Sequence, residues 1–182
     1  CKIKKITRDD LSKNWLIIND YEKIIIKKLH INSKLLGQLT FITKGATSGN
    51  KKIFTVNKTY ADSNRFEPEL LRNSINSANI RKYELENSGK YLIYIDQNID
   101  LSKYPNIKKY LEEFKNELSK RNEVKKGLYP WFRIERPRDR KIFEANEKIV
   151  VPYRAKFNRF ALDTNQGFND GGGSYSISLK KD

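Results

Sequence analysis

The sequence of 182 residues has little cysteine and histidine, no methionine and no long apolar run. The lone Cys1 cannot form an internal disulfide, which excludes a secreted disulfide scaffold. Cys1 and His30 are the only residues of their types, so a zinc site built from such side chains is nearly excluded. Apolar runs such as 15–18 and 24–26 are far shorter than the roughly 20 residues that span a bilayer.

The absences also bear on how the chain is organised. No charged-then-apolar leader opens the sequence, so we expect no signal peptide and a cytoplasmic location. Without methionine nothing here could start translation, and we expect a domain that belongs to a longer protein. The length fits one domain over residues 1–182, with possible lobes at 1–100 and 101–182.

Positive charge is what the sequence has in excess. The chain has 37 Lys and Arg against 22 Asp and Glu, a net charge of +15. With 10 Tyr, 9 Phe and 2 Trp, it has too many core-forming residues to be disordered. A folded domain of this charge is expected to meet an anionic partner, most often nucleic acid. An anionic membrane surface or an acidic protein is the alternative.

The charge is distributed unevenly along the chain. Residues 23–58 contain eight Lys and no Asp or Glu, whereas the cations of residues 121–159 are mostly Arg. A Lys ammonium is a mobile point charge suited to phosphates, and an Arg fork binds two acceptors at once, including those of guanine. Scattered Lys residues indicate only a solvated surface, but a stretch this long without a carboxylate favours a binding surface.

The periodicity of apolar residues predicts helices and strands without the regular alternation of a doubly wound fold. We therefore expect an α+β fold, with mixed small sheets and packed helices. The predicted helices are 20–30 and 105–120. The predicted strands are 37–43, 53–56, 91–95, 148–151, 159–162 and 174–179, with a glycine loop at 44–52 between the first two.

The glycine loop Gly45-x-x-x-Gly49 is followed by Asn50-Lys51-Lys52. A nucleotide P-loop needs four residues between its glycines, then Lys and Ser or Thr, then a helix, so an ATP site is not expected. Glycines still let backbone amides approach a phosphate, and Lys44, Lys51 and Lys52 flank these two. A contact with a DNA or RNA backbone and a simple β-turn both remain open.

A second segment, 131–141, interleaves aromatic residues with arginines. Such residues can stack on bases and bind phosphates. Pro137 favours an extended conformation at Arg136, so a plain helix is not expected. We expect Trp131 and Phe132 to anchor the segment in the core while its arginines point outward.

No motif in the sequence predicts an enzyme active site. Glu113-Phe114-Lys115, with Asp100 upstream, matches the E-x-K element of many nucleases, in which a strand projects the metal ligands. Here the element lies in the best predicted helix, with Phe114 on its apolar stripe. We expect no catalytic residue and no metal site, and we expect His30 to lie at the surface near a helix end.

Several short motifs follow one another in a fixed order along nearly the whole chain. They are Gly45-x-x-x-Gly49 with Phe54, Asn79-Ile80-Arg81-Lys82-Tyr83, Tyr91-Leu92-Ile93-Tyr94, Tyr104-Pro105 with Tyr110-Leu111, Leu118-x-x-Arg121, Trp131-Phe132, Arg136-x-Arg138, Lys148-Ile149-Val150-x-Pro152, Phe160 and Asp163. In this order and spacing they resemble the C-terminal specificity domain of TaqI-like adenine-N6 DNA methyltransferases and of the fused type II restriction–modification enzymes related to them.

The resemblance implies a target recognition domain of a bacterial restriction–modification protein. Such a domain reads a short sequence of double-stranded DNA and holds the duplex against a catalytic domain of the same chain. That catalytic domain binds S-adenosylmethionine and methylates a flipped adenine. The family's Asn-Pro-Pro-Tyr motif is absent here, so we expect no cofactor in this fragment. Trp131-Phe132 departs from the family's commoner Trp-Tyr.

The expected DNA-binding residues come from the glycine loop, from Arg81 near the expected packing residue Tyr83, and from the arginine-rich part. An RNA-binding module, a Mg-dependent nuclease and a protein-interaction lobe are the alternatives. The expected DNA-binding residues are Lys44, Asn50, Lys51, Lys52, Arg81, Arg133, Arg136, Arg138, Arg140, Arg154 and Lys156. The expected structural residues are Gly45, Gly49 and Trp131.

Overall fold

The computed structural model describes residues 19–31, 33–171 and 173–180. The chain divides into two compact units, 1–39 and 40–182. Residues on both sides of position 100, the boundary considered between lobes 1–100 and 101–182, belong to the second unit. Within the described ranges, no helix has the length and apolar character needed to cross a membrane.

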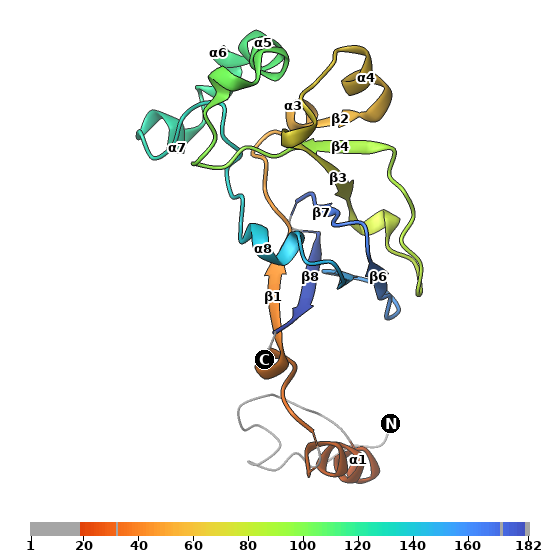
Figure 1. The fold of residues 1–182 in the computed structure, drawn as a ribbon. Helices are drawn as coiled ribbons and strands as arrows, with labels where there is room; N and C mark the ends of the chain where they lie inside the picture. Colours follow the sequence, from red (N-terminus) through yellow and green to blue (C-terminus); the bar gives the residue numbers. More distant parts are fainter. Residues whose placement is uncertain (1–18, 32, 172, 181–182) are drawn as a thin grey trace, which may run out of the picture. The chain divides into compact units, whose positions relative to one another are not determined.

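The described residues of the first unit form the helices α1 (Asp20–Ile31) and α2 (Leu36–Leu39) (Figure 1). A reciprocal capping box starts α1: the Asn19 side chain accepts the Glu22 N–H at 2.9 Å, and the Glu22 carboxylate accepts the Asn19 N–H at 2.8 Å. The helix expected over 20–30 is thus confirmed. The first residues of the strand expected at 37–43 instead belong to α2.

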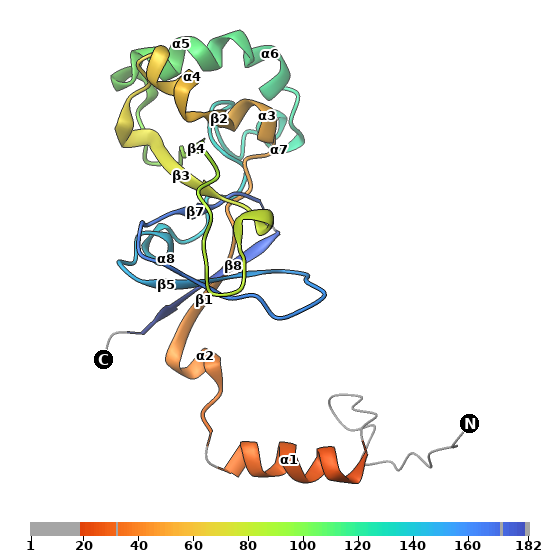
Figure 2. The same cartoon turned by 90° about the vertical axis from the view of Figure 1, so that its right-hand side faces the viewer.

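In the second unit, an antiparallel sheet joins the beginning of the unit to its end. Its strand order is β1-β8-β5-β6, so the first strand of the unit pairs with the last. Figures 1 and 2 show β1 and β8 side by side. The strands are β1 (Thr40–Lys44), β5 (Lys148–Pro152), β6 (Ala161–Asp163) and β8 (Ser174–Leu179).

A second sheet has the order β2-β4-β3-β7, and β7 pairs with β3 in parallel. In both views the helices α4 to α6 lie beside this sheet, at the end away from β1 (Figures 1 and 2). The strands are β2 (Thr55–Asn57), β3 (Leu71–Ile75), β4 (Lys90–Ile93) and β7 (Phe168–Asn169).

The helices are α3 (Lys51–Phe54), α4 (Lys58–Ser63), α5 (Pro105–Glu113), α6 (Lys115–Leu118), α7 (Asn122–Lys125) and α8 (Arg140–Phe143). Short 3₁₀ turns are η2 (Pro68–Leu70), η3 (Ser77–Asn79) and η4 (Leu101–Lys103).

One large apolar core draws on most of the second unit. Phe54, Phe143 and Phe168 are fully buried in it, although 114 positions separate the first from the last. The rings of Phe143 and Phe168 lie 4.9 Å apart, and Tyr94 meets Phe168 edge-on at 4.8 Å. Such contacts join segments from both sides of position 100 in one core.

Two predicted elements differ from the observed ones, the first of them for a reason of packing. Residues 53–54 belong to α3 rather than to a strand. Ile53 and Phe54 are both buried in the core, and one helical turn directs both inward, whereas a strand would point them to opposite faces. The helix expected over 105–120 is divided at Phe114 into α5 and α6. The predicted strands near 91, 148, 161 and 174 are present as β4, β5, β6 and β8.

Candidate nucleic-acid interface

The glycine loop and the arginine-rich segment lie side by side. Thr47 and Arg136 form an antiparallel bridge, with each backbone N–H donating to the other's carbonyl at 2.9 and 2.8 Å. The Glu135 N–H also donates to the carbonyl of Ser48. Two basic segments that are nearly 90 positions apart in the sequence thereby form one surface. We call the side chains of Asn50, Lys51, Lys52, Arg133, Arg136, Arg138 and Arg140 the glycine-loop surface.

The two glycines of the loop serve different local needs. Gly45 is buried, and a Cβ atom there would meet the carbonyl oxygens of Gly171 and Asn169, so only a glycine fits. Gly49 has φ of +80°, a conformation that side chains strain, and it lies against Arg121 and Glu135. Both glycines therefore have a steric reason to be where they are.

Arg121 holds this surface together from within. Its guanidinium donates to the carbonyls of Ser48, Trp131 and Arg133 at 3.2, 2.5 and 2.9 Å. Its Cζ lies 5.4 Å from the ring centre of Tyr129. Partial burial lowers the pKa of Arg121 from its ordinary value. Arg121 is not among the site residues predicted from the sequence, although the motif Leu118-x-x-Arg121 lies at the end of a predicted helix.

The glycine-loop residues point to different partners. The Asn50 amide donates to the Glu117 carboxylate at 2.6 Å, across 67 positions. Lys51 lies 3.3 Å from the buried carboxylate of Asp170, while more than half of its side chain stays exposed. Lys52 is exposed on α3. Lys51 and Lys52 are therefore accessible cations on an ordered turn.

The four arginines of the glycine-loop surface divide into inner and outer pairs. Arg133 stacks 4.4 Å from the Tyr129 ring centre and donates to the carbonyls of Ile134 and Glu135, so it is held in the structure. Arg136 is exposed beside Glu135 at 3.3 Å, and Arg138 is exposed with φ of +64°. The outward orientation expected for the arginines thus fits Arg136 and Arg138 better than Arg133.

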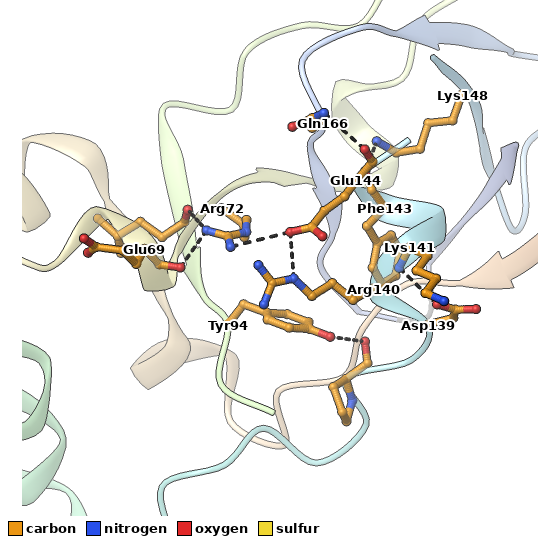
Figure 3. A network of polar contacts seen from close by, with 12 residues as sticks. Glu69, Arg72, Tyr94, Asp139, Arg140, Lys141, Phe143, Glu144, Lys148 and Gln166 are labelled. Atoms are coloured by element: carbon orange, nitrogen blue, oxygen red, sulfur yellow. Dashed lines mark hydrogen bonds and ion pairs between the residues drawn. The ribbon is translucent and has the colours of Figure 1, made fainter. Parts of the chain in front are cut away.

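Arg140, the other inner arginine, belongs to a polar network beside a cavity of about 460 Å³. Figure 3 shows Glu144 between Arg72 and Arg140, with nitrogen–oxygen distances of 3.6 and 2.7 Å. The Tyr94 hydroxyl donates to the Pro137 carbonyl at 3.1 Å, and burial raises its pKa well above the ordinary value. The network fixes the backbone next to Arg138, which lies in the cavity wall.

Four predicted residues lie away from the glycine-loop surface. Lys44, Arg154 and Lys156 lie next to aromatic rings at and after the ends of β1 and β5. Arg81 forms an ion pair with Glu86 at 2.8 Å, which raises the pKa of Arg81. The expectation that Tyr83 packs in the interior is wrong: it is 81% exposed, because its backbone adopts φ of +69° in a turn.

Trp131 is partly buried against the core and meets the Phe132 ring edge-on at 5.7 Å. This position agrees with the expected anchoring of the segment by its two aromatic residues. The Trp131 carbonyl accepts from Arg121, so its backbone also takes part in holding the surface. The Lys115 ammonium lies 5.6 Å from the indole ring.

The residues considered for a nuclease have other local partners. The Asp100 carboxylate accepts from the backbone and hydroxyl of Ser102 at the start of η4. Glu113 ends α5, and Lys115 begins α6 over Trp131. His30 is exposed in the last turn of α1. Across the described ranges, no three Asp, Glu, His or Cys side chains gather in a way that could hold a metal ion.

A buried ion pair supports the sheet β1-β8-β5-β6. The Lys148 ammonium donates to the Asp163 carboxylate at 2.5 Å and to the Phe143 carbonyl at 2.7 Å, and both side chains are fully buried. Asp163 also accepts the backbone N–H groups of Asn165 and Gly167. Burial lowers the pKa of Lys148. Both residues belong to motifs on which the TaqI-like resemblance rests, and their role in this fold is to join β5 to β6.

No family model matches the chain. The proteins to which it is similar include a type II methyltransferase and a type IIL restriction–modification enzyme, and they support a domain related to restriction–modification proteins. The chain is 29% identical over 138 residues to the type II methyltransferase M.MjaIV of Methanocaldococcus jannaschii. The match covers 70% of this chain and 46% of that protein. It matches the structure of the type IIL restriction–modification enzyme MmeI in complex with DNA at a TM-score of 0.55 and 10% identity, over 82% of this chain and 20% of MmeI.

Coverage and sequence identity limit what these two similarities show. The chain spans less than half the length of either protein. At 10% identity, the likeness to MmeI concerns the fold alone. It agrees with the two small sheets and packed helices described above, and the expected α+β class is confirmed.

Proposed function

We propose that this chain is a target recognition domain that binds double-stranded DNA in a sequence-specific manner, as the TaqI-like resemblance implies. The observation that carries the proposal is the bridge between Thr47 and Arg136, which places the cations of the glycine loop beside those of the arginine-rich segment. Clustered cations on one ordered surface are suited to the regularly spaced phosphates of a duplex.

Within this surface, the accessible cations have the most direct role. Lys51, Lys52 and Arg136 are exposed and contact phosphates, and Arg138 reaches phosphates or one guanine edge. Arg133 and Arg140 hold the backbone on which these side chains stand. Lys44, Arg81, Arg154 and Lys156 extend the DNA contact beyond the glycine-loop surface.

The similarity to a type II methyltransferase, of which the chain spans 46%, supports a division of labour in the parent protein. In this proposal the catalytic domain lies elsewhere in the same chain, binds S-adenosylmethionine and methylates adenine. The present domain has no catalytic residue of its own and positions the DNA. The structure of MmeI, of which 20% matches this chain, is a complex with DNA, and this supports the same role here.

The test is duplex binding by the full chain, measured by fluorescence anisotropy at low salt. We expect Arg136→Ala/Arg138→Ala to weaken binding by roughly tenfold. Lys103→Ala/Lys109→Ala is the matched control, because it removes the same charge from exposed residues of η4 and α5 and should change affinity less. Equal losses in the two double variants would contradict the proposal, as would tighter binding to single-stranded RNA than to duplex DNA.

A further inference from the structure

The loop between β5 and β6, residues 153–160, is fixed at both ends and exposed between them. At its start, the Tyr153 N–H donates to the Gly173 carbonyl at 2.8 Å. At its end, the Phe160 carbonyl accepts the Tyr83 N–H at 2.8 Å, which brings the 80–86 segment against the loop. We call Tyr83, Tyr153, Arg154, Lys156, Phe157 and Phe160 the β5–β6 loop surface.

Large aromatic side chains on this surface are turned toward solvent. Phe157 is 73% exposed and Tyr83 is 81% exposed, and Tyr153 and Phe160 are also exposed. Tyr83 has φ of +69°, a strained conformation for a tyrosine, which is held by its bond to Phe160. A single exposed ring is ordinary, but four in two joined segments, one of them strained, indicate a binding surface.

Cations accompany these rings. Lys156 lies 5.5 Å from the Phe157 ring centre, Arg154 lies 5.5 Å from that of Tyr153, and Lys44 approaches Tyr153 from the end of β1 at 4.9 Å. Residues 148–162 contain no Asp or Glu. In the joined segment, Glu86 is paired with Arg81, and Glu84 is the remaining carboxylate. The surface is therefore both aromatic and positively charged.

This combination identifies the chemistry of the ligand. The cations match phosphates, but a paired duplex hides the faces of its bases, so its phosphates alone would leave the exposed rings unused. An unstacked base offers a flat π-face together with neighbouring phosphates. Resting on the proposed function, we infer that the β5–β6 loop surface binds unpaired bases of DNA by stacking them on Phe157 and Tyr83.

The test uses the full chain and two duplexes of one sequence, of which one carries a single unpaired 2-aminopurine. The unpaired base should improve affinity by about fivefold or more. Fivefold is the smallest gain expected when one base stacks on an aromatic side chain. Stacking should also quench the fluorescence of 2-aminopurine. Phe157→Ala and Tyr83→Asn should reduce both effects, and Phe157→Trp should preserve them. Tyr21→Ala, at a tyrosine of α1 that is 73% exposed, is the control and should change neither.

The outcomes separate this inference from the proposed function. If the chain binds both duplexes equally, or if Phe157→Ala weakens both to the same degree, the stacking inference is overturned while duplex binding stands. If the chain binds neither duplex at low salt, both are overturned. A preference for the unpaired base that disappears in Phe157→Ala and survives in Phe157→Trp supports the inference.

Discussion

The two basic surfaces of the second unit hold their cations in different ways. On the glycine-loop surface, several side chains have polar partners: Asn50 donates to Glu117, and Lys51 lies beside the carboxylate of Asp170. On the β5–β6 loop surface, Lys156 and Arg154 lie over aromatic rings that are themselves exposed. The polar contacts of the first surface fix the direction of the groups that make them, whereas the second surface leaves both rings and charges accessible.

The cations behind the net charge of +15 therefore differ in their roles. Some, such as Lys148 and Arg121, hold the fold and are withdrawn from solvent to different extents. Others are exposed on ordered backbone, and others accompany exposed rings. We assign the ordered surface to duplex phosphates and the aromatic surface to unpaired bases.

Removing the support beneath the β5–β6 loop should have the largest effect on stability. Lys148→Met leaves the buried Asp163 carboxylate without its cation, and we expect a loss of about 3–5 kcal/mol in the free energy of unfolding, measured in urea. Replacing both residues by apolar ones should cost less than Lys148→Met alone. A loss below about 1 kcal/mol for Lys148→Met would show that β5 and β6 do not depend on this pair.

Breaking the support of the glycine-loop surface should come next. Arg121→Leu removes the donor shared by the carbonyls of Ser48, Trp131 and Arg133, and we expect a loss of about 2–4 kcal/mol in the free energy of unfolding. Arg121→Lys should recover only part, because an ammonium lacks the planar fork. Among the molecules that remain folded, duplex affinity should fall, but the preference for an unpaired base should be retained. Loss of that preference would mean that the two surfaces are not separate.

Replacing a glycine of the glycine loop should have a smaller effect on stability. Gly49 and Gly127 both have positive φ, but a Cβ at Gly49 would lie 3.1 Å from Arg121, while nothing lies within 4 Å of one at Gly127. Gly49→Ala should therefore be more destabilising than Gly127→Ala, which measures backbone strain alone at about 1 kcal/mol. Equal thermal denaturation midpoints for the two variants would contradict a close fit of Gly49 against Arg121.

The smallest effect concerns alkaline pH. Burial raises the pKa of Tyr110, whose hydroxyl donates to the Ile53 carbonyl, to about 12. Its ordinary value is about 10, so the unfolded chain loses this proton first, and the stability contributed by Tyr110 is lost as pH rises from about 10 through 12. Tyr110→Phe should show a shallower decline in the urea midpoint over this range. An unchanged decline would mean that the hydroxyl is not held near α3.

The sequence predicted more of the fold than of the site. Periodicity predicted α1 and β8 closely, because their apolar residues follow one regular spacing. It did not predict the turn of α3, where Ile53 and Phe54 are helical because both must enter a core built by distant segments. Composition likewise identified two basic segments but not their contact at Thr47 and Arg136, since no local pattern specifies pairing across so long a separation.

Individual side chains were the least predictable feature. Tyr83 was expected to pack inside, yet the left-handed turn at this residue exposes it. Arg133 and Arg136 look alike in sequence, but the ring of Tyr129 and two carbonyls hold the former while the latter points outward. Roles of this kind depend on tertiary neighbours, which a single sequence does not specify.

The salt dependence of duplex binding shows whether the glycine-loop surface contacts DNA phosphates. The logarithm of the association constant for the full chain should fall linearly with the logarithm of salt concentration, by about 0.9 for each phosphate contacted. Arg136→Ala/Arg138→Ala should make this slope shallower by about one to two, whereas Lys103→Ala/Lys109→Ala should leave it unchanged. A flat salt dependence, or the same slope in the arginine double variant, would contradict the assignment of the glycine-loop surface to DNA phosphates.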